Sequence, residues 1–306
     1  MYNKSMKIFI TGHKGFFGSK LTKYIDVAYP HIQWQGYDLL ENRNDLCDKY
    51  NLDLHIRKYN PDVVIHLAAK AGVTESKMYP QHYIDSNITG TQNLIDVCEK
   101  NKINKLIFFS SSSVFGKRKD EVPVQEEFEK DPVSLYGITK LAGEQIVKHS
   151  KIHEKFIVRP FTIYGSEGRP DGVIYKWINQ IKKERKITIY GDENSYRGYV
   201  YAEHLIELVL QLAFPNVVLK PFFAKGECMD LNVGGSEKVY LKDIVDVFDE
   251  FVPGLEKEYI ERSQEDIVGQ VANTDKVKSL LDFDPPKKFK ENLRKILEKE
   301  LGFLQC

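Results

Sequence analysis

A strand, a glycine-rich turn and a helix follow one another directly near the amino terminus of this 306-residue chain. Residues 7–11 form a β-branched and aromatic run, and apolar residues then recur at helical intervals as far as Ala28. The turn between them contains Gly12, Gly15 and Gly18. Glycines at this spacing allow a tight turn, close approach of the backbone to a pyrophosphate, and close packing of helix on strand. This order predicts the first βα unit of a parallel sheet, with the helix N-terminus facing phosphates.

A carboxylate follows at the distance that such a unit requires. Residues 33–38 predict a second strand that ends in Asp38, about 20 residues after Gly18. An acid at this place can accept hydrogen bonds from both hydroxyls of an adenosine ribose, which favours NAD over NADP. We therefore predict a dinucleotide site here, and we expect His13 and Lys14 in the turn to face solvent.

Strands and helices continue to alternate beyond this unit, which is typical of a Rossmann-type, doubly wound parallel α/β sheet. The apolar patterns predict further strands over residues 62–69, 105–112 and 155–164, and helices over residues 81–100 and 131–150. This part of the chain therefore supplies the sheet of the dinucleotide-binding domain.

After Gly165 the pattern becomes looser, with a helix expected over residues 173–184 and a short strand over residues 187–190. Short helices and strands then alternate from Tyr240 onward. We predict two units: a dinucleotide-binding domain of residues 1–165 plus about 196–235, and a smaller C-terminal α/β lobe of residues 166–195 and 236–306 that binds the substrate.

The composition excludes several kinds of partner. Lys and Arg number 44 and so do Asp and Glu, so there is no electrostatic case for binding nucleic acid or an anionic membrane. No window approaches the ~20 apolar residues of a membrane-spanning helix. The cysteines are far apart and lack a histidine at ligand spacing, which predicts neither disulfides nor a metal site but reduced thiols in a cytoplasm. They are Cys47, Cys98, Cys228 and Cys306.

Tyr136 and Lys140 lie four residues apart in the predicted helix 131–150, so their side chains share one helix face. A lysine charge near a tyrosine hydroxyl favours the phenolate and lowers its pKa, which makes a general base. The pattern is common on ordinary surface helices, so its interpretation depends on the other motifs of the chain.

Taken in order, these motifs resemble those of the extended short-chain dehydrogenase/reductases, a family of NAD-dependent nucleotide-sugar epimerases and dehydratases. The resemblance covers nearly the whole chain. It includes stretches similar to the family's motifs at residues 187–197 and 273–283. The main motifs are Gly12-x-x-Gly15-Phe16-x-Gly18, His66-Leu67-Ala68-Ala69, Asn87-x-x-Gly90-Thr91, Ser110 to Gly116, Tyr136-x-x-x-Lys140 and Arg159-Pro160-Phe161-Thr162-Ile163-Tyr164-Gly165.

The resemblance implies roles for individual residues. Tyr136, Lys140 and Ser111 match the catalytic residues, with the Ser111 hydroxyl bonding the same substrate oxygen as Tyr136. It also implies a homodimer that forms through the helices at 81–100 and 136–150. The residues that match NAD contacts are Gly12, Gly15, Phe16, Phe17, Gly18, Asp38, Asp45, Leu46, Ala68 and Ala69, together with Tyr136 and Lys140.

The residues after Ser111 bear on the reaction. In the family's 4,6-dehydratases an Asp-Glu pair follows the catalytic residue, and in its uronate decarboxylases a Glu stands at position 113. This chain has Ser112 and Ser113. A serine hydroxyl cannot act as acid or base for dehydration near pH 7. Epimerisation through a transient 4-keto sugar is the main expectation, and net oxidation or reduction of a nucleotide sugar is the alternative.

The chain is most similar to the UDP-glucuronate 4-epimerase group, on the stretches at 111–116, 132–136 and 162–171. A sugar carboxylate needs neutral donors or a cation, and Ser112, Ser113, Thr162 and Arg169 can supply these. Arg197 matches the arginine that binds the nucleotide diphosphate. The chain departs from the group at Phe115, Pro160 and Gly198. A dehydrogenase, a 4-keto-sugar reductase, a 4,6-dehydratase and a non-catalytic NAD-binding sensor or scaffold remain as alternatives.

Overall fold

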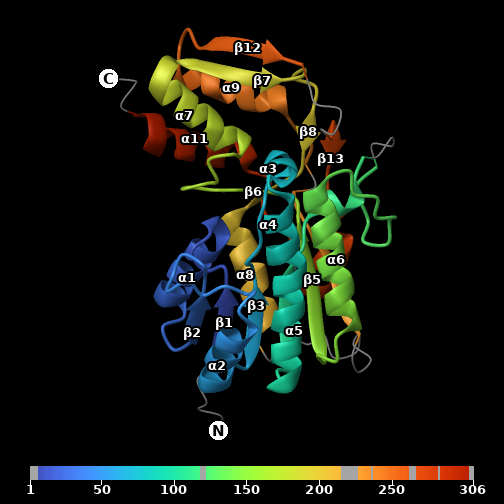
Figure 1. The fold of residues 1–306 in the computed structure, drawn as a ribbon. Coiled ribbons are helices and arrows are strands. Elements are labelled where there is room, and N and C mark those ends of the chain that lie inside the picture. The colour runs from blue at the N-terminus through green and yellow to red at the C-terminus, as the bar shows by residue number, and fades with distance from the viewer. Residues whose placement is uncertain are drawn as a thin grey trace.

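A six-stranded parallel sheet forms the centre of the computed structural model (Figure 1), which describes residues 6–117, 122–214, 227–235, 237–261, 267–281 and 283–302. The strand order is β10-β5-β4-β3-β1-β2, and every neighbouring pair is parallel. This confirms the predicted Rossmann-type α/β fold. The strands are β1 (Lys7–Thr11), β2 (Gln33–Tyr37), β3 (Val63–His66), β4 (Lys105–Phe109), β5 (Glu154–Pro160) and β10 (Cys228–Val233).

Helices cover both faces of this sheet, because its strands alternate apolar side chains between the two faces. In β1, Ile8 and Ile10 pack into one buried cluster and Phe9 into another. The first cluster lies under α1 (Phe16–Ala28), α8 (Ala202–Ala213) and α10 (Asp275–Leu281). The second lies under α2 (Lys49–Tyr59), α5 (Gly90–Lys100) and α6 (Leu135–His149).

Two of the predicted elements are interrupted in the structure. The helix expected over 81–100 consists of α4 (Pro80–Ile84), a π-helical turn (Asp85–Thr89) and α5, and it follows the short helix α3 (Val73–Met78). The strand expected over 155–164 ends at Pro160. Thr162–Tyr164 form a separate strand, β6, which pairs with β9 (Tyr199–Tyr201).

The second lobe lies beyond one end of the sheet, at the top of Figure 1. Its cluster of buried residues is separate from those of the sheet and centres on Trp177, whose side chain is 1 % exposed. Its elements are α7 (Val173–Glu184), β7 (Lys186–Tyr190), α9 (Leu241–Phe251), β12 (Glu256–Ile260) and α11 (Phe289–Leu301). A small sheet of β8 (Tyr196–Arg197), β11 (Val239–Tyr240) and β13 (Gly269–Gln270) completes the fold.

Three of the four cysteines fall in the described segments, and Cys47, Cys98 and Cys228 all carry free thiols there. Cys306 lies outside the described residues. Within those same segments, we find no helix whose length and apolar character would let it cross a membrane.

Candidate active site

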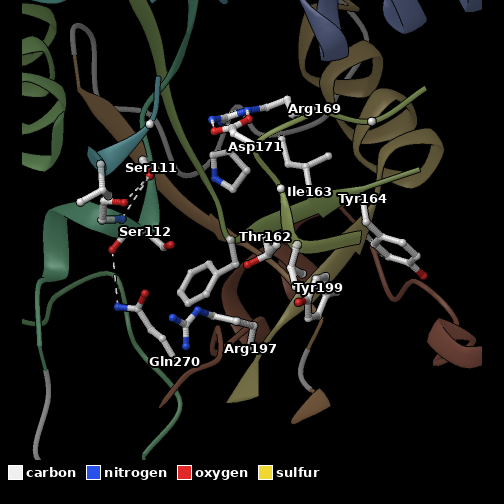
Figure 2. Close-up of a pocket in the computed structure, with 18 of the residues that line it drawn as sticks. Ser111, Ser112, Thr162, Ile163, Tyr164, Arg169, Asp171, Arg197, Tyr199 and Gln270 are labelled. Carbon is white, nitrogen blue, oxygen red and sulfur yellow. Dashed lines mark hydrogen bonds and ion pairs between the residues drawn. The ribbon is translucent and has the colours of Figure 1, made fainter. Parts of the chain in front are cut away.

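A cavity of about 400 Å³ lies where the carboxyl ends of the sheet strands meet the second lobe. Loops that follow β4 and β5 supply one side of its wall, and the segment from Gly165 to Val173 supplies another. Many residues predicted from the sequence meet here (Figure 2). The predicted residues in its wall are Phe16, Ser111, Ser112, Ser113, Tyr136, Thr162, Arg169 and Arg197.

Ser111 stands at the start of a tight turn directly after β4. Its hydroxyl oxygen accepts a hydrogen bond from the Ser113 amide at 3.1 Å, and this caps the 3₁₀ turn Ser112–Phe115. The Oγ atoms of Ser111 and Ser113 are also 3.1 Å apart. The side chain of Ser111 also interacts with that of Tyr136 and lowers the pKa of the phenol. The structure therefore places these two side chains beside each other in the wall of the cavity.

Tyr136 lies in the first turn of α6, whose N-terminus is capped by Ser134 through a 3.1 Å bond from the Gly137 amide. Burial raises the pKa of Tyr136, while the hydrogen bond to Ser111 and the charge of Arg169 lower it. In the protein without NAD, the lowering of this pKa that we expect from Lys140 and the nicotinamide together is thus not present, and burial prevails. Desolvation is the larger effect, and the phenol keeps its proton at neutral pH.

Lys140 is buried one turn further along α6, with its Nζ 4.6 Å from the centroid of the Phe108 ring. It does not line the cavity itself. Burial lowers the pKa of Lys140 to about 7, and the carboxylate of Glu144 opposes this shift. The ammonium is therefore a poorly solvated charge behind the wall that carries Tyr136.

Glu144 belongs to a buried ionic cluster that fixes the loop of Ser110 to Ser113, called here the serine loop, to the sheet. Its Oε1 accepts a hydrogen bond from Ser110 Oγ at 2.5 Å. Arg159 donates from Nε to Oε1 at 2.7 Å and from Nη2 to Oε2 at 2.8 Å. Arg159 also contacts Asp230, which pairs with Lys148 at 2.7 Å. Glu144 and Arg159 are both 0 % exposed, so these contacts replace the hydration of the carboxylate and of Arg159 Nε and Nη2, whereas Arg159 Nη1 is buried without a hydrogen-bond partner among the described residues.

Asn87 ties a second loop to the catalytic helix. Its side chain is 1 % exposed and lies in the π-helical turn. The amide oxygen accepts from the Lys70 backbone N–H at 2.7 Å, and Nδ2 donates to the Lys70 carbonyl and to Thr139 Oγ1, both at 3.0 Å. The loop after β3 is thereby fixed against α6.

Two arginines lie at opposite ends of the cavity (Figure 2). The guanidinium of Arg169 forms a two-pronged ion pair with Asp171, through Nε to Oδ1 at 2.9 Å and through Nη2 to Oδ2. Arg197, in β8, donates from Nη1 to the Tyr196 carbonyl at 2.9 Å. The cavity thus has an arginine at each end, of which Arg169 is already paired with a carboxylate, and serine and tyrosine hydroxyls also line its wall.

Sequence reasoning missed several residues in the wall. Gln270, in β13, donates from Nε2 to the Ser112 carbonyl at 3.4 Å. Tyr199 packs edge-on against Tyr164, with ring centroids 5.8 Å apart, and Asp171 faces Arg169. Only the Gly-Arg-Pro-Asp stretch at 168–171 gave a signal for any of these, because the others follow from the fold of the second lobe.

The glycine-rich turn has the shape that a dinucleotide requires. Gly12 has φ +76°, and a β-carbon there would lie 2.5 Å from the Ala68 amide nitrogen. A β-carbon on Gly18 would lie 2.3 Å from the Gly12 carbonyl oxygen, whereas one on Gly15 would meet nothing closer than 3.3 Å. No side chain caps the N-terminus of α1, where Phe16 and Phe17 follow. The turn is therefore tightly packed inside and open toward a phosphate.

The other predicted NAD residues lie at the same edge of the sheet. Asp38 directly follows β2, and its carboxylate accepts from the amides of Lys14 at 2.9 Å and Leu40 at 3.0 Å. Ala68 and Ala69 follow β3, and the Ala68 amide donates to Thr11 Oγ1 at 3.3 Å. The carboxylate of Asp45 accepts from the Cys47 amide at 2.9 Å, and Leu46 is buried in the core. These positions fit an adenosine laid across the end of β2.

His13 does not face solvent, and that expectation is wrong. Its side chain is 3 % exposed, and its Nε2 lies 3.0 Å from Oε2 of Glu41. The ring occupies the space left by the missing side chain of Gly36, where a β-carbon would come within 2.4 Å of it. Lys14 fits the expectation better, because nearly half of its side chain is exposed.

Residues 8–217 match the model of the NAD-dependent epimerase/dehydratase family, and the chain belongs to this family. It is an NAD-dependent enzyme, as the glycine turn and Asp38 indicate. The match includes β1, the serine loop, Tyr136 and Lys140, and both arginines of the cavity.

Relatives of the chain agree with the predicted group. The UDP-glucuronate 4-epimerase of Thermodesulfobacterium geofontis is 28% identical, over 94% of this chain and 93% of that protein. The crystal structure of UDP-glucuronic acid 4-epimerase from Bacillus cereus, in complex with UDP-glucuronic acid and NAD, is 27% identical with a TM-score of 0.84, covering 96% of this chain and 99% of that one. MoeE5 in complex with UDP-glucose and NAD is 25% identical with a TM-score of 0.85, covering 97% and 99%.

Proposed function

We propose that this protein is a nucleotide-sugar 4-epimerase that acts through a transient 4-keto sugar, with UDP-glucuronate as its substrate. The observation that carries the proposal is the place of Tyr136 and Ser111 side by side in the wall of a cavity that has an arginine at each end. A secondary alcohol bound at these hydroxyls can lose its proton there. The names of the relatives at 27% and 28% identity support the choice of reaction and sugar.

The chain's own residues handle the proton and the orientation of the sugar. Tyr136 accepts the proton of the sugar hydroxyl, and Ser111 holds the same oxygen by a hydrogen bond. The buried charge of Lys140, one turn away, together with the positive charge of a bound nicotinamide, would favour the phenolate form of Tyr136 that accepts this proton. NAD, when bound, supplies the acceptor and later the donor of a hydride. Inversion of the carbon would require the hydride to return to the opposite face of the 4-keto sugar, and Tyr136 would then return its proton to the sugar oxygen.

The wall of the cavity suits a sugar that carries a carboxylate. Ser112, Ser113 and Thr162 offer neutral hydroxyl donors, and Arg169 offers a cation. We assign the diphosphate to Arg197 at the other end. Because serines stand where a dehydratase carries Asp and Glu, elimination of water from the sugar is disfavoured.

We assign the NAD contacts to the glycine turn, Asp38, Asp45-Leu46 and Ala68-Ala69, and the nucleotide sugar to the second lobe. The division into residues 1–165 plus about 196–235, and residues 166–195 plus 236–306, is part of this proposal. The larger unit then holds the cofactor and the smaller unit closes over the substrate.

We further propose that the enzyme is a homodimer that forms through α4–α5 and α6. Ile84 is 36% exposed and Ile138 is 49% exposed, and both lie on these helices. Burial of such side chains against a second copy is favourable. A cytoplasmic location is also proposed, since the three described thiols are unpaired.

The experiment is incubation of the purified enzyme with UDP-glucuronate and, separately, with UDP-glucose, GDP-, CDP- and dTDP-sugars. We expect a new anomeric proton signal from UDP-galacturonate, with no net change in absorbance at the nicotinamide band. Steady production of NADH would instead identify a dehydrogenase. An unchanged spectrum with every sugar would refute the epimerase.

A further inference from the structure

The buried His13 joins the two cofactor-binding segments of the fold. It follows Gly12 in the glycine turn, whereas its partner Glu41 lies in the loop after β2. Its ring lies over Gly36 of β2, and its centroid is 5.9 Å from that of Trp34. The contact therefore crosses from the turn that faces phosphates to the strand and loop that carry Asp38.

The chemistry of the pair is that of a neutral donor and a carboxylate. Burial lowers the pKa of His13, although the nearby charges of Glu41 and Asp38 raise it and that of Lys14 lowers it. The ring is therefore neutral near pH 7 and has one proton to donate. Since Nδ1 is buried without a hydrogen-bond partner in this structure, we place the proton on Nε2, which faces Glu41.

The loop that Glu41 anchors is bent in an unfavourable way. Asn42 and Arg43 both adopt positive φ, at 53° and 54°, which costs non-glycine residues about 1–2 kcal/mol each. Glu41 lies at the centre of the bend, since its amide donates to the Asp38 carbonyl at 2.9 Å and its carbonyl accepts from Asn44 at 3.1 Å. A side-chain anchor at Glu41 therefore holds a loop that would otherwise relax.

Asp38 is placed by the same two segments. Its Oδ2 accepts from the amide of Lys14, the residue after His13, and its backbone carbonyl accepts from the amide of Glu41. Any movement of the turn relative to the loop would therefore move this carboxylate.

We propose that His13 and Glu41 form a latch, a buried hydrogen-bonded pair that holds Asp38 in place and thereby sets the affinity of the enzyme for the adenosine half of NAD. The role is one of positioning, because neither side chain lies in the wall of the cavity at Tyr136. The proposed role concerns binding of the cofactor alone, so it does not depend on which reaction the enzyme catalyses.

The test uses ADP-ribose, which contains the adenosine and diphosphate of NAD but no nicotinamide, with calorimetry as the readout. His13→Ala and Glu41→Ala are each expected to weaken ADP-ribose binding about tenfold or more, as loss of a hydrogen bond to a charged group should. The double variant is expected to be no weaker than Glu41→Ala, because that single change already removes the contact with His13 as well as the exposed pairing of Glu41 with Lys14 at 3.6 Å. Glu41→Gln keeps an acceptor oxygen and is expected to bind within about threefold of the unmodified protein.

His55→Ala is the matched control. His55 also bonds a side chain of β2, through Nδ1 to Gln35 Nε2 at 2.9 Å, but it takes no part in the pairing of His13 with Glu41. It is expected to leave ADP-ribose affinity unchanged. Thermal unfolding of each variant shows that it is folded. If His13→Ala is folded and binds ADP-ribose as tightly as the unmodified protein does, or if the two alanine effects simply add, the latch is refuted.

Discussion

The buried carboxylate of Glu144 allows a quantitative prediction about stability. Its two oxygens accept three hydrogen bonds, one from Ser110 and two from Arg159, at 2.5–2.8 Å. In Glu144→Gln, an NH₂ group replaces one carboxylate oxygen and points its donors at the guanidinium. Arg159 also loses the negative charge that both of its hydrogen bonds met. The change leaves a buried cation incompletely compensated.

The size of the effect follows from what remains around Arg159. Removing one partner of a buried ion pair costs about 3–5 kcal/mol. Because Asp230 still contacts Nη2 at 2.5 Å, we expect the lower end, about 3 kcal/mol. In a protein of this size this corresponds to a drop of about 5 °C in Tm.

The assay is scanning calorimetry of the protein without NAD, since a bound cofactor would raise Tm. Lys148→Gln is the control, because it removes a charge from the same cluster at a side chain that is 32% exposed. It is expected to cost less than about 1 kcal/mol. If Glu144→Gln costs no more than Lys148→Gln, the reasoning about an uncompensated buried charge is wrong.

Three further predictions concern the cofactor, the proton and pH. Tyr136→Phe should lose several orders of magnitude in kcat yet still bind NAD, since only the proton path is removed, and near-normal turnover would contradict the mechanism. Asp38→Ala should weaken NAD far more than the nucleotide sugar in titrations of both, and an equal loss would contradict its role. Burial lowers the pKa of His66 to about 3. As pH falls below about 6.5, its imidazole is therefore protonated in the unfolded chain while it stays neutral in the folded protein. Stability should therefore decline between pH 6.5 and 3, with a flatter decline in His66→Gln; the same slope in both proteins would show that His66 does not contribute.

The sequence predicted the parts of the site that depend on local pattern. The glycine turn and Asp38 could be placed because strand, turn and helix are contiguous, and their spacing fixes their geometry. Ser111, Tyr136 and Thr162 could be expected in one place because parallel strands bring their carboxyl ends to one edge of the sheet. The structure confirms this fold and brings these residues together.

Other features depend on contacts that no local pattern contains. Gln270 reaches Ser112 across 158 residues, from a strand of two residues. The burial of His13 depends on the space above Gly36, which exists only once β2 lies beside the turn. The pKa of Tyr136 depends on how fully the folded protein excludes water from it, and the sequence contains no measure of that.

Because Asn87 lies in the π-helical turn, its position depends on the number of residues in that turn. A π turn holds one more residue than an α turn, so deleting a residue within Asp85–Thr89 would restore regular α geometry at no loss of helix. Each residue of an α-helix rotates the chain by about 100°, so the deletion would swing Asn87 out of its place between Lys70 and Thr139. A chain with this deletion would keep its fold, but Asn87 would no longer fix the loop after β3 to α6. Another contact would be needed to hold that loop in place.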